Sequence, residues 1–190
     1  MGRNKKFSLA EMFDATEQLL LTVGYEGFTV GLVAEQLNVS RAAIYKYYTN
    51  KEALIADFML ERMTAFMAEI EQIPKQQKFQ VQIDYLLGVI FRSKDLHQVL
   101  SYAHAIHPKE DTVILEKIQK LNDMHRLMYG PMRAMIEQGK AEGLLKTHLS
   151  NDIILAFIFQ SISIPNHTRL EEKEFLDSVK EMIFSGITSK

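Results

Sequence analysis

Apolar residues recur at intervals of three and four along almost the whole chain, and polar or charged residues fill the positions between them. This spacing places apolar side chains on one face of an α-helix, whereas a half-buried strand alternates apolar and polar residues. Alternating segments rich in Val, Ile and Thr between Gly or Pro turns do not occur in the sequence. The pattern therefore predicts an all-α fold without an internal repeat. We expect about nine helices, at residues 8–24, 30–37, 40–48, 50–73, 79–91, 93–107, 110–143, 150–165 and 170–187.

Residues that satisfy free backbone groups mark the helix boundaries. Ser8 begins the first helix and forms a capping box with Glu11, and Gly24 stops it. Asn38 ends the second helix, because asparagine adopts the left-handed backbone more readily than most residues. Pro131 is expected to kink the long seventh helix. The other expected N-caps are Thr29, Ser40, Asn50 and Ser150.

Residues 29–54 predict two short helices joined by a tight turn, followed by the start of a long helix. In the second of these helices, Ala43, Ile44 and one tyrosine face inward. Residues 38–51 contain three cations and no acid, although residues 1–52 balance six Lys and Arg against six Asp and Glu. The positive charge is therefore local, as phosphate binding requires. The outward face, of a kind that suits a major groove, comprises Arg41, Ala42, Tyr45 and Lys46.

The segment VAEQLNVSRAAIYKYYTNKEAL closely resembles the helix-turn-helix signature of TetR-family transcriptional repressors. The resemblance rests on the valine-serine turn, the aliphatic-tyrosine pair and the terminal Lys-Glu-x-Leu, and it covers roughly the first 55 residues. It implies a DNA-binding domain at residues 1–52 and a ligand-binding and dimerisation domain at residues 53–190. Asn38 stands where the family most often has glycine, and Ala42 and Ala43 where it often has glycine and threonine. A relative's operator therefore cannot be assumed for this chain.

Seven residues of this segment are the predicted DNA contacts. Thr29 and Lys51 lie at helix N-termini, which favour an anion, so we expect both to bind phosphates together with Tyr47. Arg41 is the candidate for reading guanine. Arg3, Lys5 and Lys6 form either a basic arm that binds DNA or a tail without a role. Among Tyr45, Tyr47 and Tyr48, we expect Tyr48 to be buried. The complete predicted set is Thr29, Arg41, Ala42, Tyr45, Lys46, Tyr47 and Lys51.

The eighth expected helix is apolar nearly all round between residues 153 and 162. A surface helix of a monomer does not tolerate such a composition, so we expect a homodimer through the eighth and ninth helices. The resemblance implies the same four-helix arrangement, and two-fold symmetry predicts a palindromic operator. The alternative is that the eighth helix is simply the core of one domain.

Methionines are frequent, and several lie close together on the seventh helix. Such side chains adapt to varied apolar ligands, although ordinary core filling explains them equally well. The interpretation is a pocket for an unidentified small apolar ligand. A second pattern, His97, His104 and His107, falls at i, i+7 and i+10 and raises a metal site as a further alternative, but we predict neither a metal nor a cofactor. The candidate pocket residues are Phe91, Tyr102, Met124, Met128 and Met132.

Composition bounds the remaining possibilities. The chain has 190 residues, 47% of them hydrophobic, and a net charge of −2, so it is no generic polyanion binder. It lacks cysteine, which excludes thiolate chemistry and fits a reducing cytoplasm. Neither a signal peptide nor an apolar run of the ~20 residues that span a bilayer is recognisable. No nucleophile–base pair, phosphate loop or metal triad with usable spacing indicates an enzyme.

These observations together predict a cytoplasmic transcriptional regulator, a repressor that a small ligand releases from its palindromic operator. A DNA-binding protein of the same fold that acts in chromosome organisation or division without an inducer is the main alternative. A protein-binding adaptor is the third.

Overall fold

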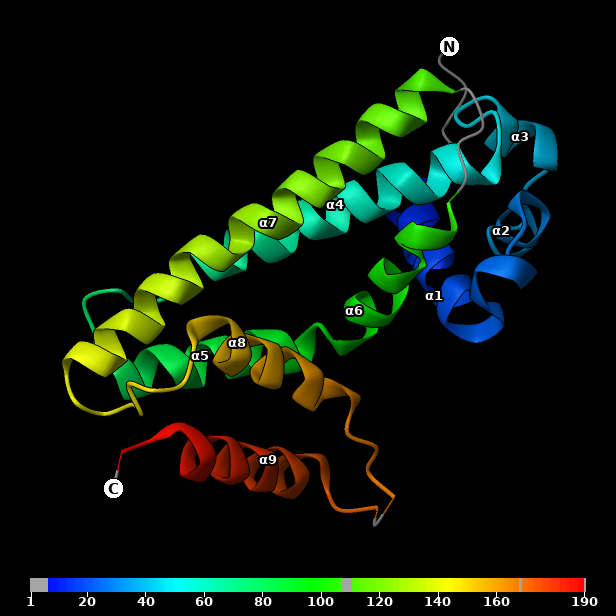
Figure 1. The fold of residues 1–190 in the computed structure, drawn as a ribbon. Helices are drawn as coiled ribbons and strands as arrows, with labels where there is room; N and C mark the ends of the chain where they lie inside the picture. Colours follow the sequence, from blue (N-terminus) through cyan, green and yellow to red (C-terminus); the bar gives the residue numbers. More distant parts are fainter. Residues whose placement is uncertain (1–6, 107–110, 168, 190) are drawn as a thin grey trace. The chain divides into compact units, whose positions relative to one another are not determined.

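The computed structural model describes residues 7–106, 111–167 and 169–189. Within these ranges the protein is all-α, as predicted, with nine α-helices and two short 3-10 helices (Figure 1). The predicted arm residues Arg3, Lys5 and Lys6 lie outside them. The α-helices are α1 (Leu9–Gly27), α2 (Val30–Gln36), α3 (Arg41–Tyr45), α4 (Lys51–Glu71), α5 (Phe79–Arg92), α6 (Lys94–Leu100), α7 (Thr112–Ala141), α8 (Asn151–Gln160) and α9 (Glu172–Ile187), and the 3-10 helices are η1 (Ser101–Ala105) and η2 (Ser161–Ser163).

The chain packs into two compact units. The first contains the described residues of Met1–Ala65 and Asp95–Met124, and the second contains those of Phe66–Lys94 and His125–Lys190. Helices α4 and α7 contribute residues to both units. The functional division at residue 52 stays a prediction.

The first helix begins and bends as its sequence predicts. Glu11 N donates to Ser8 Oγ over 3.1 Å, and Ser8 N donates to the Glu11 carboxylate over 2.6 Å, which completes the capping box. The hydrogen bonds that Ser8 N and Ser8 Oγ donate to the Glu11 carboxylate hold its pKa below the ordinary value. Gly24 has a φ of +67° and interrupts the helical backbone, but α1 continues to Gly27. Gly24 therefore kinks α1, and the prediction that the helix ends there is wrong.

The turn between α2 and α3 depends on Asn38, which has a φ of +51°. This left-handed residue confirms the prediction for the end of α2. Beyond it, Val39 N donates to Ala34 O over 2.9 Å and closes the turn. Ser40 occupies the N-cap position of α3, but its side chain makes no capping hydrogen bond, contrary to expectation. Helix α3 spans Arg41–Tyr45 and is thus shorter than the predicted 40–48.

Each unit has its own apolar core. In the first, the rings of Phe13 on α1 and Phe58 on α4 meet edge to face with their centroids 6.0 Å apart, and both residues are buried. In the second, Leu86, Met132 and Ile158 are fully buried and come from α5, α7 and α8. The apolar periodicity that predicted the helices therefore also identified the core faces.

Several boundaries in the second half differ from expectation. Helix α6 ends at Leu100 and continues only as η1, so His97 and His104 do not share one α-helix. His107 lies outside the described residues. Helix α7 continues through Pro131. Helix α8 begins as predicted, because Ile153 N donates to Ser150 Oγ over 3.2 Å, but it ends at Gln160, well before Pro165.

In the described part of the chain, no helix combines the length and the apolar character needed to cross a membrane.

The turn at Asn38 yields a stability prediction. Replacing Asn38 by Ala should lower the free energy of unfolding by about 1 kcal/mol, because a side chain with Cβ is strained in the left-handed region and alanine lacks asparagine's local hydrogen bonding. Asn38→Gly is the matched control and should unfold at the same or a higher urea concentration. Urea unfolding followed by circular dichroism measures both. Equal destabilisation by the two substitutions would contradict this account of the turn.

Candidate DNA-binding site

Helix α3 has one buried side and one exposed side. Ile44 is completely buried and Ala43 is half-buried, which confirms the predicted inward face. Tyr48, just beyond the helix, is buried as predicted, whereas Tyr45 is 52% exposed. The outward face, comprising Arg41, Ala42, Tyr45 and Lys46, is exposed throughout. We call this face the recognition face.

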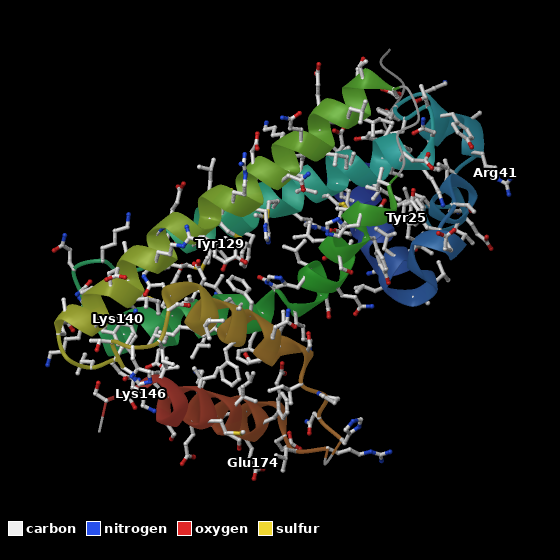
Figure 2. The ribbon with its side chains drawn as sticks, viewed as in Figure 1. Tyr25, Arg41, Tyr129, Lys140, Lys146 and Glu174 are labelled. Atoms are coloured by element: carbon white, nitrogen blue, oxygen red, sulfur yellow. The ribbon has the colours of Figure 1, made fainter. Side chains whose placement is uncertain are left out.

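Arg41 is the first residue of α3 and projects from the edge of the first unit (Figure 2). Its guanidinium lies over Gly31 in α2, where an added Cβ would come within 2.8 Å of Arg41 Nε. A glycine at position 31 therefore leaves room for the arginine to rest against the first turn of α2. The side chain remains exposed and joined to α3 by flexible torsions, so it is free to reach a base or phosphate.

Thr29 has the N-cap role that the sequence predicts. Its hydroxyl accepts a hydrogen bond from Leu32 N over 3.3 Å, and its backbone is extended. The residue is exposed at the start of α2, where backbone N–H groups and the helix dipole favour an anion. Its hydroxyl proton remains available for donation to such an anion.

Lys51 lies at the start of α4, but its ammonium group has partners within the protein. Lys51 Nζ donates to the carbonyl oxygen of Tyr25 over 3.1 Å and lies 4.3 Å from the centroid of the Tyr25 ring. Burial, followed by the charges of Glu52 and Glu26, raises the pKa of Tyr25. Lys51 thus joins the end of α1 to the start of α4. Sequence reasoning missed this contact because no local pattern pairs the two positions.

Tyr47 is 48% exposed, and its ring meets that of Phe7 edge to face with centroids 5.6 Å apart. The segment that precedes α1 and the segment that follows α3 therefore lie together. The exposed half of Tyr47 is adjacent in sequence to Lys46, whose side chain is also exposed. The seven predicted DNA-binding residues thus comprise the exposed recognition face and three residues with additional structural contacts.

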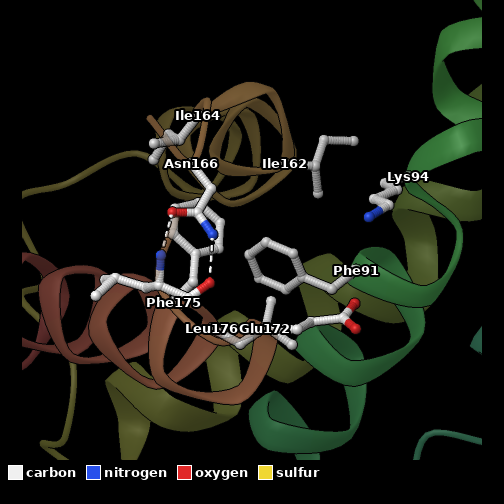
Figure 3. Close-up of a pocket in the computed structure, with 9 residues that line it drawn as sticks. Phe91, Lys94, Ile162, Ile164, Asn166, Glu172, Phe175 and Leu176 are labelled. Atoms are coloured by element: carbon white, nitrogen blue, oxygen red, sulfur yellow. Dashed lines mark hydrogen bonds between the residues drawn. The ribbon is translucent and has the colours of Figure 1, made fainter. Parts of the chain in front are cut away.

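A groove of about 340 Å³ lies in the second unit (Figure 3). Lys94 and Glu172 are the charged residues of its lining, and Asn166 closes the adjoining loop through a hydrogen bond from its amide to Leu170 O over 2.8 Å. Such an apolar surface with a few polar groups can bind a small amphipathic molecule. Its apolar lining residues are Phe91, Ile162, Ile164, Leu170, Phe175 and Leu176.

The predicted pocket residues are not gathered in this groove. Only Phe91 of the predicted set lines it. Met128 and Met132 are buried core residues, and Met124 is half-buried. The Tyr102 hydroxyl lies 3.7 Å from the position that a Cβ at Gly24 would occupy, so this tyrosine packs beside the kink of α1. The groove residues after α8 have no distinctive sequence signal beyond their apolar character.

Metal ligation has no visible basis in the ranges that the structure describes, where no group of three or more His, Cys, Asp or Glu is arranged to hold an ion.

Two helices joined by a tight turn, an exposed cationic face on the second helix and a buried base define a helix-turn-helix DNA-binding protein. Residues 13–58 match the family model described as bacterial regulatory proteins, tetR family. The chain belongs to the TetR family of helix-turn-helix transcriptional regulators, which is not a family of enzymes.

The similarity to known proteins extends beyond residues 13–58. The fatty acid metabolism regulator protein of Bacillus subtilis is 22% identical over 99% of this chain and 100% of its own length. The ketosteroid transcriptional regulator KstR2 of Mycobacterium tuberculosis shares the fold with a TM-score of 0.78 at 14% identity, over 100% of this chain and 98% of that one. The transcriptional regulator FadR of Bacillus subtilis, solved with stearoyl-CoA, has a TM-score of 0.65 at 19% identity, over 95% and 100%.

Proposed function

We propose that this regulator is a homodimeric repressor that binds a palindromic operator through the recognition face and is released by a small ligand with a large apolar part. The observation that carries the proposal is the recognition face itself. Arg41, Tyr45 and Lys46 are exposed on one short helix whose opposite side is buried. Cations contribute affinity for phosphates, and Arg41 contributes discrimination between bases.

Exposed apolar side chains on the last two helices support the homodimer. Ile153 and Phe157 lie four residues apart on α8 and are 63% and 52% exposed, and Met182 on α9 is 68% exposed. The other side of α8 is buried within the unit, as Leu155 and Ile158 demonstrate. A second copy of the chain would cover the exposed residues and present two recognition faces related by a two-fold axis. A palindromic operator follows from that symmetry.

The groove and the relatives support a ligand with an acyl chain. Apolar side chains dominate the lining of the groove, while Lys94 supplies a positive charge for an anionic group. A fatty acid metabolism regulator matches the whole chain, and a protein of the same fold has been solved with stearoyl-CoA. In the proposed dimer, the two recognition faces can be spaced to fit the operator or spaced differently. A ligand that binds more tightly to the second arrangement would shift the population away from the DNA-binding state.

The operator is tested by selecting bound duplexes from a random DNA library at two salt concentrations. The wild-type protein should enrich a palindromic motif, and Arg41→Ala should lose about 1–3 kcal/mol of discrimination at one base pair of each half-site. Lys75→Ala removes an exposed lysine from the α4–α5 connector and should leave the motif unchanged. Absence of a motif at both salt concentrations would contradict operator binding and favour non-specific DNA binding or an adaptor role.

The dimer is tested by placing a charge on α8. Phe157→Glu should yield a monomer in analytical ultracentrifugation, because an ionised carboxylate is costly to bury in an apolar interface. Val81→Glu introduces the same charge at a 46% exposed apolar position on α5 and should leave the dimer intact. A dimeric Phe157→Glu variant would contradict an interface through this face of α8.

Ligand release is tested by fluorescence anisotropy of a labelled operator with stearoyl-CoA, stearate and a ketosteroid as separate probes. We expect stearoyl-CoA to release the DNA. Ile164→Asp, which places a charge in the groove at a 43% exposed position, should raise the concentration needed at least about tenfold. Its operator affinity without ligand should match wild type. Release by none of the probes would contradict the ligand class, and equal release of both proteins would exclude the groove.

A further inference from the structure

Arg41 on α3 covers a glycine of the neighbouring helix. Gly31 is the second residue of α2, and a Cβ built on it would lie 2.8 Å from Arg41 Nε, 2.9 Å from Arg41 Nη2 and 3.0 Å from Arg41 Cζ. Three atoms of one guanidinium group therefore surround the place where any other residue would carry its side chain. The arginine of α3 thus occupies space that belongs to a position on α2.

The backbone beneath the guanidinium is held in place by its neighbours. Val30 before Gly31 and Val33 after it are 4% and 0% exposed, so the first turn of α2 is anchored in the core of the first unit. Thr29 caps the same turn by accepting a hydrogen bond from Leu32 N over 3.3 Å. The guanidinium therefore rests on an ordered helix rather than on a loop.

The contact with Gly31 leaves the donors of Arg41 available. No other residue in the described ranges forms a hydrogen bond or an ion pair with Arg41, whose side chain is exposed at the edge of the first unit (Figure 2). A guanidinium carries five N–H donors in a planar fork. Packing against one helix limits how this plane is tilted, and a correctly tilted plane can make two parallel hydrogen bonds to guanine.

We propose that Gly31 is a specificity-determining residue of the DNA-binding site, although its own side chain is a hydrogen atom. Gly31 leaves the gap that the guanidinium fills, and it thereby limits the orientations of Arg41 before DNA arrives. A long side chain that is ordered in the free protein loses less conformational freedom on binding. Gly31 has this role only if Arg41 reads a base, as proposed above.

A substitution at position 31 separates this role from a role in folding. Gly31 has an ordinary helical backbone without a positive φ, which alanine adopts without strain. Alanine is also the better helix former. The atoms that its Cβ would displace belong to the far end of a flexible side chain rather than to the backbone. Gly31→Ala should therefore keep the fold and move only Arg41.

The test is a double-mutant cycle of Gly31→Ala and Arg41→Ala in the full-length protein. Fluorescence anisotropy compares the selected operator with a duplex changed at the base pair whose preference Arg41→Ala loses. Gly31→Ala should lower the preference for the operator about two- to tenfold, the range that corresponds to ordering one long side chain. In the Arg41→Ala background, Gly31→Ala should change nothing. Gly130→Ala on α7 is the matched control, because a Cβ there meets no atom within 4 Å, and it should keep the wild-type preference.

Urea unfolding supplies a readout that a merely structural role would not give. Gly31→Ala and Gly130→Ala should both unfold at the same urea concentration as wild type or a higher one, because alanine favours the helix. Loss of base preference without loss of stability is the expected signature of Gly31→Ala. A lower unfolding midpoint for Gly31→Ala would overturn the inference, because the backbone rather than Arg41 would then have yielded to the new Cβ.

A third measurement does not require an operator. In isotopically labelled protein, the Nε–Hε signal of Arg41 is identified by its loss in Arg41→Ala, and it should show a nuclear Overhauser effect to the α-protons of Gly31. This signal should become that of a mobile side chain in Gly31→Ala and stay unchanged in Gly130→Ala. If the library yields no motif, the proposed function fails, and the signal still decides whether Gly31 orders Arg41. A mobile wild-type signal, an undiminished preference in Gly31→Ala, or an equal loss in both backgrounds would sink the inference.

Discussion

The recognition helix exists because its base is buried. Helix α3 has five residues, far fewer than the ~12–15 that an isolated helix needs to be even marginally stable in water. Its conformation therefore depends on the burial of Ile44 and Tyr48 and on the left-handed backbone of Asn38. Every proposed DNA contact on α3 depends on this buried base, because a helix of five residues is not stable without it.

Charge has two separate roles around this helix. Arg41 and Lys46 are exposed and give the recognition face a local positive charge, although the net charge of the whole chain is −2. Lys51 and Lys117 have partners within the protein: Tyr25 for the first and Asp57 for the second. The first pair can exchange water and counterions for phosphates. The second pair stabilises the positions of α1 and α7 with respect to α4 within the first unit.

The second half of the chain has more apolar surface than its own core uses. Helix α8 buries Ile154 and Ile158 but exposes Ile153 and Phe157, so two sides of one helix are apolar. One side is accounted for by the core of the second unit. The other side motivates the homodimer, and the groove beside α9 motivates the ligand. Both proposals for the second unit therefore rest on apolar surface that its own core leaves exposed.

The sequence by itself determined the fold class, most helix boundaries and the two sides of α3, because these follow from interactions between residues close in the chain. Capping by Ser8, Thr29 and Ser150 and the turn at Asn38 are local effects of this kind. Tertiary structure alone decided which distant groups meet: Lys51 with Tyr25 and Asp57 with Lys117. It also decided that Tyr102 packs beside Gly24, and that the groove draws its lining from α5, the segment after α8 and α9. Apolar periodicity indicates that a side chain is buried, but the identity of its neighbours depends on how helices far apart in sequence pack together.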